Sequence, residues 1–76
     1  MTFEKVRGII AEHMGMAEDK ISMETSLADD IGADSLDIFQ IVSAIEEEFD
    51  MGFEKESIEG MKTVADAVKF IDSKGA

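Results

Sequence analysis

The chain has 76 residues, with 18 acidic and 7 basic side chains, a net charge of -11 at pH 7 and no cysteine. This length allows one small domain, residues 1–76, and the absence of cysteine excludes disulfide bonds and thiolate metal sites. The charge disfavours binding to nucleic acid or to anionic membrane surfaces, and no apolar run approaches the ~20 residues that span a bilayer.

The spacing of apolar residues predicts a first helix from Thr2 to about Met14. Its apolar side chains, starting with Phe3, recur on one stripe at helical spacing. Thr2 suits the N-cap position, and Gly15 can adopt the left-handed conformation that ends a helix. We therefore expect an amphipathic helix that packs on the core through one face.

A long connection follows, from Met16 to about Ala33. Structureless loops of this length are uncommon in small domains and are often functional or internally anchored. Ile21, Leu27 and Ile31 are distributed along the connection and could fix it to the core. We expect an ordered loop.

A second helix is predicted from Ser35 to about Phe49. Asp34 fits the N-cap, and Asp37, three residues on, completes a capping box with aspartate in place of the usual glutamate. Both carboxylates also lie at the positive end of the helix dipole, where negative charge is favourable. Gly52 follows closely enough to help end this helix.

Two shorter segments complete the chain. A weak short helix is expected around Ile58, between Lys55 and Met61, and a last helix begins at Thr63 with Asp66 as the partner in its cap. The predicted fold class is all-α. It is a small four-helix bundle of three main helices and one short helix, with a long loop between the first two main helices.

The second helix has two different faces when its residues are placed at 100° intervals. Its predicted core face consists of Ile38, Ile41, Val42, Ile45 and Phe49. Leu36 and Phe39 lie on or beside the opposite, acidic side, next to Ser35. Single exposed apolar residues are normal in proteins, but this position favours a docking patch whose acidic rim meets a basic partner.

The Ser35 hydroxyl is a poor candidate for a catalytic nucleophile. Residues 32–36 do not match the Gly-x-Ser-x-Gly elbow, and the flanking carboxylates would oppose a developing oxyanion. The single histidine, His13, has no obvious second catalytic partner and is interpreted as a packing or surface hydrogen-bonding residue. We therefore predict a protein without catalytic activity, in which Ser35 is an exposed attachment point.

No specific metal site is predicted. Neither Gly32 nor Gly52 has oxygen ligands at the alternate positions that an EF-hand loop requires before its central glycine. Weak binding of magnesium or calcium is expected among the carboxylates around Ser35, because it would relieve their mutual repulsion. These carboxylates belong to Asp29, Asp30, Asp34 and Asp37.

Leu27, residues 30–37 and residues 46–50 together resemble the acyl carrier protein family, in the form used by dissociated fatty acid synthesis. The resemblance covers nearly the whole chain and is most specific from Gly32 to Asp37. It implies that Ser35 carries 4′-phosphopantetheine, taken from coenzyme A, through a phosphodiester bond. It also implies that Asp34 caps the helix and helps to present the serine, and that the arm's thiol holds acyl groups as thioesters.

The helix faces and the resemblance together predict a partner-binding surface, and the resemblance alone implies an acyl pocket. The partner-binding residues are Leu36, Asp37, Phe39, Gln40, Ser43, Glu46, Glu47 and Glu48. The acyl-pocket residues, between the second and third helices, are Ile38, Ile41, Ile45, Phe53, Ile58 and Met61. Gln40, Ser43 and residues 51–55 depart from the common family pattern, which leaves partner preference and pocket shape open.

The partners implied by the resemblance are a phosphopantetheinyl transferase and the ketosynthases, reductases, dehydratases and acyltransferases with basic docking patches. We expect a cytoplasmic protein, because no basic-then-apolar leader is present at the N-terminus. We also expect a monomer that binds neither nucleic acid nor membrane. The expected function is to carry growing acyl chains in fatty acid biosynthesis. A discrete carrier of a polyketide, peptide or other specialised pathway remains open, as does an acidic interaction domain without a prosthetic group.

Overall fold

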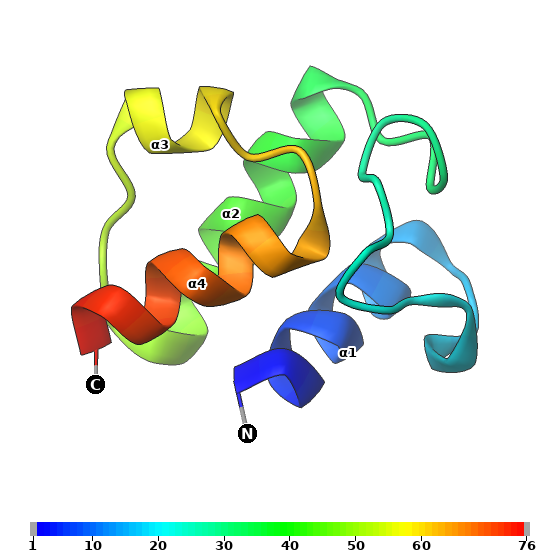
Figure 1. Ribbon diagram of the computed structural model, residues 1–76, viewed down its shortest axis with the longest axis horizontal. Coiled ribbons are helices and arrows are strands. Elements are labelled where there is room, and N and C mark those ends of the chain that lie inside the picture. Colours follow the sequence, from blue (N-terminus) through cyan, green and yellow to red (C-terminus); the bar gives the residue numbers. More distant parts are fainter. Residues whose placement is uncertain (1, 76) are drawn as a thin grey trace.

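Four α-helices surround a shared core in the computed structural model, which describes residues 2–75 (Figure 1). They are α1 (Thr2–Met14), α2 (Ser35–Phe49), α3 (Lys55–Glu59) and α4 (Val64–Gly75), and a short 3₁₀ turn, η1 (Glu18–Lys20), follows α1. α1 packs against both α2 and α4, and α3 packs against α2. The predicted all-α bundle of three main helices and one short helix is confirmed.

The core lies where α1, α2 and α4 meet. Its buried residues include Val6, Ile10, Ile41, Val42, Ile45, Val64, Ala67, Val68 and Ile71, with Ile21, Leu27 and Met61 from the connections. Removal of apolar surface from water contributes about 25 cal/mol per Å², so the apolar stripes fix how each helix is rotated. In α2 the predicted core face is confirmed, with Ile38 and Phe49 packed partly buried at its edges. The opposite side of α2 is therefore turned to solvent.

The connection between α1 and α2 is ordered, as expected. Ile21 and Leu27 are buried and Ile31 is partly buried against the core. The 3₁₀ turn η1 near its start was not predicted, because three residues are too few to show a periodicity. These anchors hold the segment that leads into α2.

Backbone hydrogen bonds tie this connection to the start of α4. The Leu27 N–H donates to the Lys62 carbonyl at 2.9 Å, and the Val64 N–H donates to the Thr25 carbonyl at 3.0 Å. Ser26 and Thr63 form an isolated antiparallel bridge between the same two segments. The loop thus satisfies backbone groups by pairing with residues 35 to 39 positions later in the chain.

The helix ends agree only in part with the sequence. Gly15 follows α1 at φ 66°, the left-handed conformation expected of a glycine after a helix. The left-handed residue that ends α2 is Asp50, at φ 52°, and not Gly52, since aspartate is one of the few residues that tolerate this region. Thr2 lies inside α1, and its hydroxyl donates to Asp72 Oδ1 at 2.7 Å, which joins the start of α1 to α4.

α4 begins at a capping box formed by Thr63 and Asp66. Asp66 Oδ2 accepts from the backbone N–H groups of Lys62 at 2.9 Å and Thr63 at 3.0 Å, and Thr63 Oγ1 accepts from the Asp66 N–H at 3.3 Å. These donors favour the charged carboxylate. The pKa of Asp66 is therefore lowered from its ordinary value of 3.8, mainly by the Lys62 N–H and then by the Thr63 N–H.

We expect Asp66→Ala to lower the free energy of unfolding at neutral pH by roughly 1 kcal/mol, the typical cost of losing a helix cap. Because the folded pKa is lowered, this contribution is fully present above pH 3.8 and is lost as the pH falls through the folded value. Thermal unfolding followed by circular dichroism between neutral and acid pH measures the difference. Glu47→Ala, which removes an equal charge from an exposed position, is the control. A difference that is independent of pH would contradict this account.

Candidate functional site

Ser35 is the exposed first residue of α2, and the backbone that leads to it is fixed. Gly32 turns the chain at φ 76°, a conformation that favours glycine. Ala33 is buried, and its N–H donates to the Leu27 carbonyl at 2.9 Å. The loop is therefore held on the core two residues before the serine, while the serine itself faces solvent.

The predicted capping box at the start of α2 is confirmed. Asp34 Oδ1 accepts from the Asp37 N–H at 2.9 Å, and Asp37 Oδ2 accepts from the Asp34 N–H at 3.2 Å. These two bonds join the residues on either side of Ser35 and fix the first turn of the helix. None of the hydrogen bonds among residues 2–75 involves the Ser35 hydroxyl, so this oxygen is free to react with a group brought from outside.

Asp37 has a second contact that the sequence did not reveal. Its Oδ1 lies 3.3 Å from His13 Nε2, at the end of α1. The backbone N–H of Asp34, and then the His13 side chain, lower the pKa of the Asp37 carboxyl from its ordinary value. Asp37 is thus ionised at neutral pH, and its oxygens serve the helix cap.

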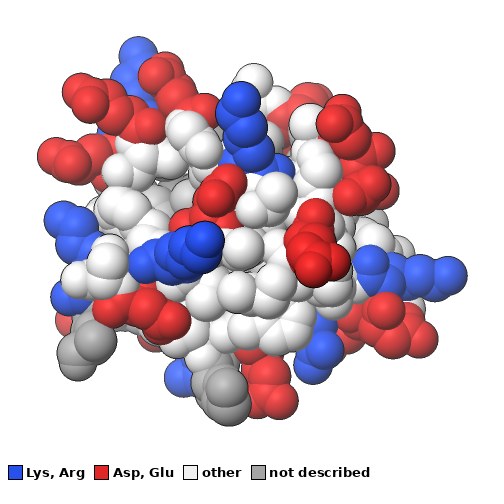
Figure 2. Space-filling view, viewed as in Figure 1, with Lys and Arg blue, Asp and Glu red and all other residues white. Residues whose placement is uncertain are grey.

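The solvent side of α2 carries the two apolar residues noted in the sequence. Leu36 is 63% exposed and Phe39 is 60% exposed, and both lie within the first turn and a half of the helix beside Ser35. On the face of the molecule drawn in Figure 2, acidic side chains are distributed around much of the outline, with fewer basic ones among them. The two exposed apolar side chains therefore belong to a molecule whose surface is acidic.

The other predicted partner-binding residues differ in their surroundings. Gln40, Ser43 and Glu47 are exposed. Glu48 is also exposed and forms an ion pair with Lys5 of α1 at 3.6 Å. The remaining glutamate of this run, Glu46, is partly buried, and its Oε2 accepts from the Phe53 N–H at 2.7 Å. Glu46 therefore also has a structural role, because it holds the chain that leaves α2.

An opening of about 390 Å³ begins at Ser35 and extends between α2 and α3. Its lining residues are Ser35, Ile38, Phe39, Lys55, Ile58, Glu59 and Met61. The volume lies within the range of pockets that bind small molecules, and such pockets are mostly apolar with a few polar groups. Three of the residues predicted for an acyl pocket, Ile38, Ile58 and Met61, are brought together here.

The other three residues predicted for that pocket lie elsewhere. Ile41 and Ile45 belong to the buried core and are 3% and 0% exposed. Phe53 stacks against Phe70 of α4, with ring centroids 4.4 Å apart. Lys55 and Glu59, which also line the opening, were not anticipated, although their spacing from Ile58 places all three on adjoining positions of α3.

The carboxylates near Ser35 do not assemble into a metal site. Within residues 2–75 no group of three or more His, Cys, Asp or Glu side chains is placed to hold a metal ion. Asp30 Oδ2 accepts from the Ser26 N–H at 2.7 Å, and Asp34 serves the helix cap. Weak divalent binding at Asp29, Asp30, Asp34 and Asp37 stays a prediction. In the same described part of the chain, no helix has the length and hydrophobicity to cross a bilayer.

The sequence and the fold are both similar to those of known proteins. The family model described as "Phosphopantetheine attachment site" matches residues 4–71. Acyl carrier proteins of Clostridium perfringens and Bdellovibrio bacteriovorus are 48% identical over 69 and 71 residues, which covers 91% and 93% of this chain and 91% of each relative. A solved structure from Mycobacterium tuberculosis, described as a candidate acyl carrier protein, matches with a TM-score of 0.89 at 27% identity, over 96% of this chain and 97% of that one.

Proposed function

The chain belongs to the phosphopantetheine attachment site family, together with the acyl carrier proteins, and on that premise we propose that Ser35 carries the prosthetic arm and that the protein shuttles growing acyl chains in fatty acid synthesis. Family membership implies a covalently attached 4′-phosphopantetheine. The observation that carries the assignment to Ser35 is an exposed serine whose hydroxyl has no hydrogen bond to residues 2–75, held by a capping box at the edge of a largely apolar opening.

The residues around Ser35 fit such an arm. The hydroxyl oxygen is accessible for a phosphodiester bond, and the opening beside it can take up an apolar group. When bound, the arm supplies the thiol on which acyl groups are held as thioesters, and this chain has no cysteine of its own. Ile38, Ile58 and Met61 offer apolar contacts to an acyl chain, while Lys55 and Glu59 lie at the same opening.

The protein is a carrier without catalytic activity of its own. The carboxylates nearest to Ser35 in the sequence, Asp34 and Asp37, accept hydrogen bonds from the backbone of the capping box and are assigned a structural role. The proton of the Ser35 hydroxyl must therefore be removed by the modifying enzyme. What this chain contributes to attachment is the position of the hydroxyl oxygen.

Leu36 and Phe39 are proposed to insert into shallow apolar pockets on partner proteins, with the acidic side chains of α2 meeting basic residues around them. Complementary charge speeds and orients encounter, which suits brief visits to a transferase and to several biosynthetic enzymes of the cytoplasm. Support for fatty acid synthesis comes from the resemblance of residues 27–50 to carriers of that pathway. Transfer from the loaded carrier to ketosynthases of fatty acid and polyketide synthesis would separate the two pathways.

The decisive test of carrier function is the intact mass of the unmodified protein after incubation with coenzyme A, magnesium and a phosphopantetheinyl transferase. We expect complete conversion to a species heavier by one phosphopantetheine, since one exposed serine fits the attachment geometry. A reaction without enzyme is the control. If the mass is unchanged with several transferases of different specificity, the carrier function is wrong and an acidic interaction domain becomes the better account.

A further inference from the structure

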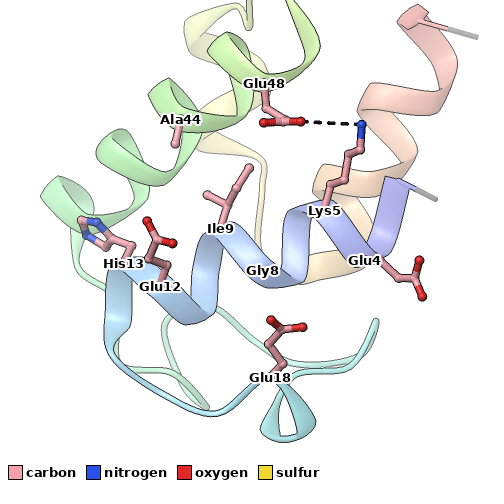
Figure 3. Close-up of a pocket in the computed structure, with 9 residues that line it drawn as sticks. All are labelled: Glu4, Lys5, Gly8, Ile9, Glu12, His13, Glu18, Ala44 and Glu48. Carbon is pink, nitrogen blue, oxygen red and sulfur yellow. Dashed lines mark ion pairs between the residues drawn. The ribbon is translucent and has the colours of Figure 1, made fainter.

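His13 connects the end of α1 to the first turn of α2. Its Nε2 atom lies 3.3 Å from Asp37 Oδ1, and the two side chains are 26% and 32% exposed. Figure 3 shows His13 at one end of the groove between these helices, with the ion pair of Lys5 and Glu48 at the other end. The two residues are 24 positions apart, so this contact forms only when α1 and α2 are packed.

Both oxygens of the Asp37 carboxylate are used inside the protein. Oδ2 accepts from the Asp34 N–H at 3.2 Å, and Oδ1 faces His13. An ionised carboxylate oxygen can only accept, so the ring donates from Nε2, whether the imidazole is neutral or protonated. The histidine therefore restrains the orientation of Asp37 and, with it, the side chain that closes the capping box over Ser35.

This restraint acts on the first turn of α2, and the first turn of a helix is less stable than its interior. The first four N–H groups of a helix have no acceptor within the helix, and the first turn frays unless side chains satisfy them. In α2 the first turn contains Ser35, and its cap depends on Asp34 and Asp37. A protein whose binding-competent conformation is only partly populated binds with an affinity reduced by that fraction.

We propose that His13 is a positioning residue for the modification of Ser35. By donating to Asp37 Oδ1 it holds the capping box closed, and the first turn of α2 is presented to the transferase in one conformation. The inference rests on the attachment at Ser35 proposed above. It assigns to α1 a part in recognition even though no residue of α1 lines the opening at Ser35.

Other charged groups line the same groove, which has a volume of about 710 Å³. They are Glu4, Lys5, Glu12, Glu18 and Glu48. Among the hydrogen bonds and ion pairs of the described residues, the partner of His13 is Asp37. The role assigned to His13 is donation of a hydrogen bond to Asp37.

The test compares three variants in steady-state kinetics of the transferase. His13→Leu keeps the bulk of the side chain and removes the donor. His13→Gln places an amide N–H near the position of Nε2. Lys5→Ala removes the ion pair to Glu48 at the other end of the groove. We expect His13→Leu to raise KM for the carrier about fivefold with kcat unchanged, the size expected for a surface hydrogen bond, and His13→Gln and Lys5→Ala to resemble the wild type.

Amide hydrogen exchange in the unmodified protein gives a second readout that needs no transferase. The Asp34 and Asp37 N–H groups should exchange faster in His13→Leu than in the wild type or His13→Gln. If the wild type is not modified at all, the attachment proposal fails. The exchange rates still test whether the contact between His13 and Asp37 stabilises the capping box. Unchanged KM and exchange in His13→Leu would overturn the inference. So would equal losses in Lys5→Ala, because they would show that general packing of α1 on α2 is responsible.

Discussion

Ser35→Ala is expected to abolish attachment completely, so that the mass of the protein stays constant under conditions that convert the wild type fully. The alanine removes the oxygen that would form the bond to phosphorus. It should leave the fold unchanged, because the Ser35 hydroxyl makes no hydrogen bond in the described part of the chain and alanine is favourable in a helix. Intact mass spectrometry measures the attachment, and circular dichroism verifies that the helices are retained.

Ser43→Ala is the matched control for this loss. Ser43 is a second exposed serine on α2, but it lies two turns further along the helix, without a capping box around it. At the end point of the reaction the Ser43 variant should be fully converted, because Ser43 is predicted to contact partners and not to carry the arm. A mass increase that persists in Ser35→Ala, or disappears in Ser43→Ala, would show that the arm is attached at another residue.

Phe39→Asp is expected to weaken binding to the transferase and to acyl-transferring partners by roughly thirtyfold, with little change in helix content. Phe39 is 60% exposed, so its replacement removes apolar contact with a partner without opening the core. Aromatic residues at the centre of an interface commonly contribute 2 kcal/mol or more, which corresponds to this factor. Titration calorimetry with the transferase, using the Ser35→Ala background to prevent turnover, measures the change.

Gln40→Asp separates lost contact from added charge. It introduces the same negative charge at the neighbouring exposed position and leaves Phe39 in place. We expect a much smaller effect, or tighter binding if the partner surface is basic. Loss of the cooperative thermal transition in Phe39→Asp would mean that this face of α2 is part of the core. Equal weakening in both variants would assign the effect to charge alone.

The features of the site that are local in sequence could be predicted, because they depend on interactions between close neighbours. The start of α2 is set by Asp34 and Asp37, which lie three residues apart and satisfy each other's N–H groups. Its rotation is set by the apolar stripe around Ile41 and Ile45. Together these two facts expose Ser35 and the neighbouring Phe39.

The features that depend on where distant elements meet could not be predicted. Ile38 and Ile45 lie on the same stripe of α2, but α3 covers only its start, so one lines the opening and the other is buried in the core. His13 meets Asp37 through the crossing of α1 and α2, which periodicity does not specify. The end of α2 at Phe49 was predicted, but its left-handed C-cap, Asp50, was not, because a left-handed aspartate is uncommon and glycine is the ordinary signal.

The hydrogen bond between Thr2 and Asp72 has a practical consequence for handling the protein. Figure 1 shows the start of α1 and the end of α4 toward the lower edge of the bundle, while α2 begins near the upper edge. An affinity tag, a fluorophore or a second domain joined before α1 or after α4 would therefore lie on the side remote from Ser35. Several copies joined in tandem could each keep Ser35 and the start of α2 accessible to other proteins.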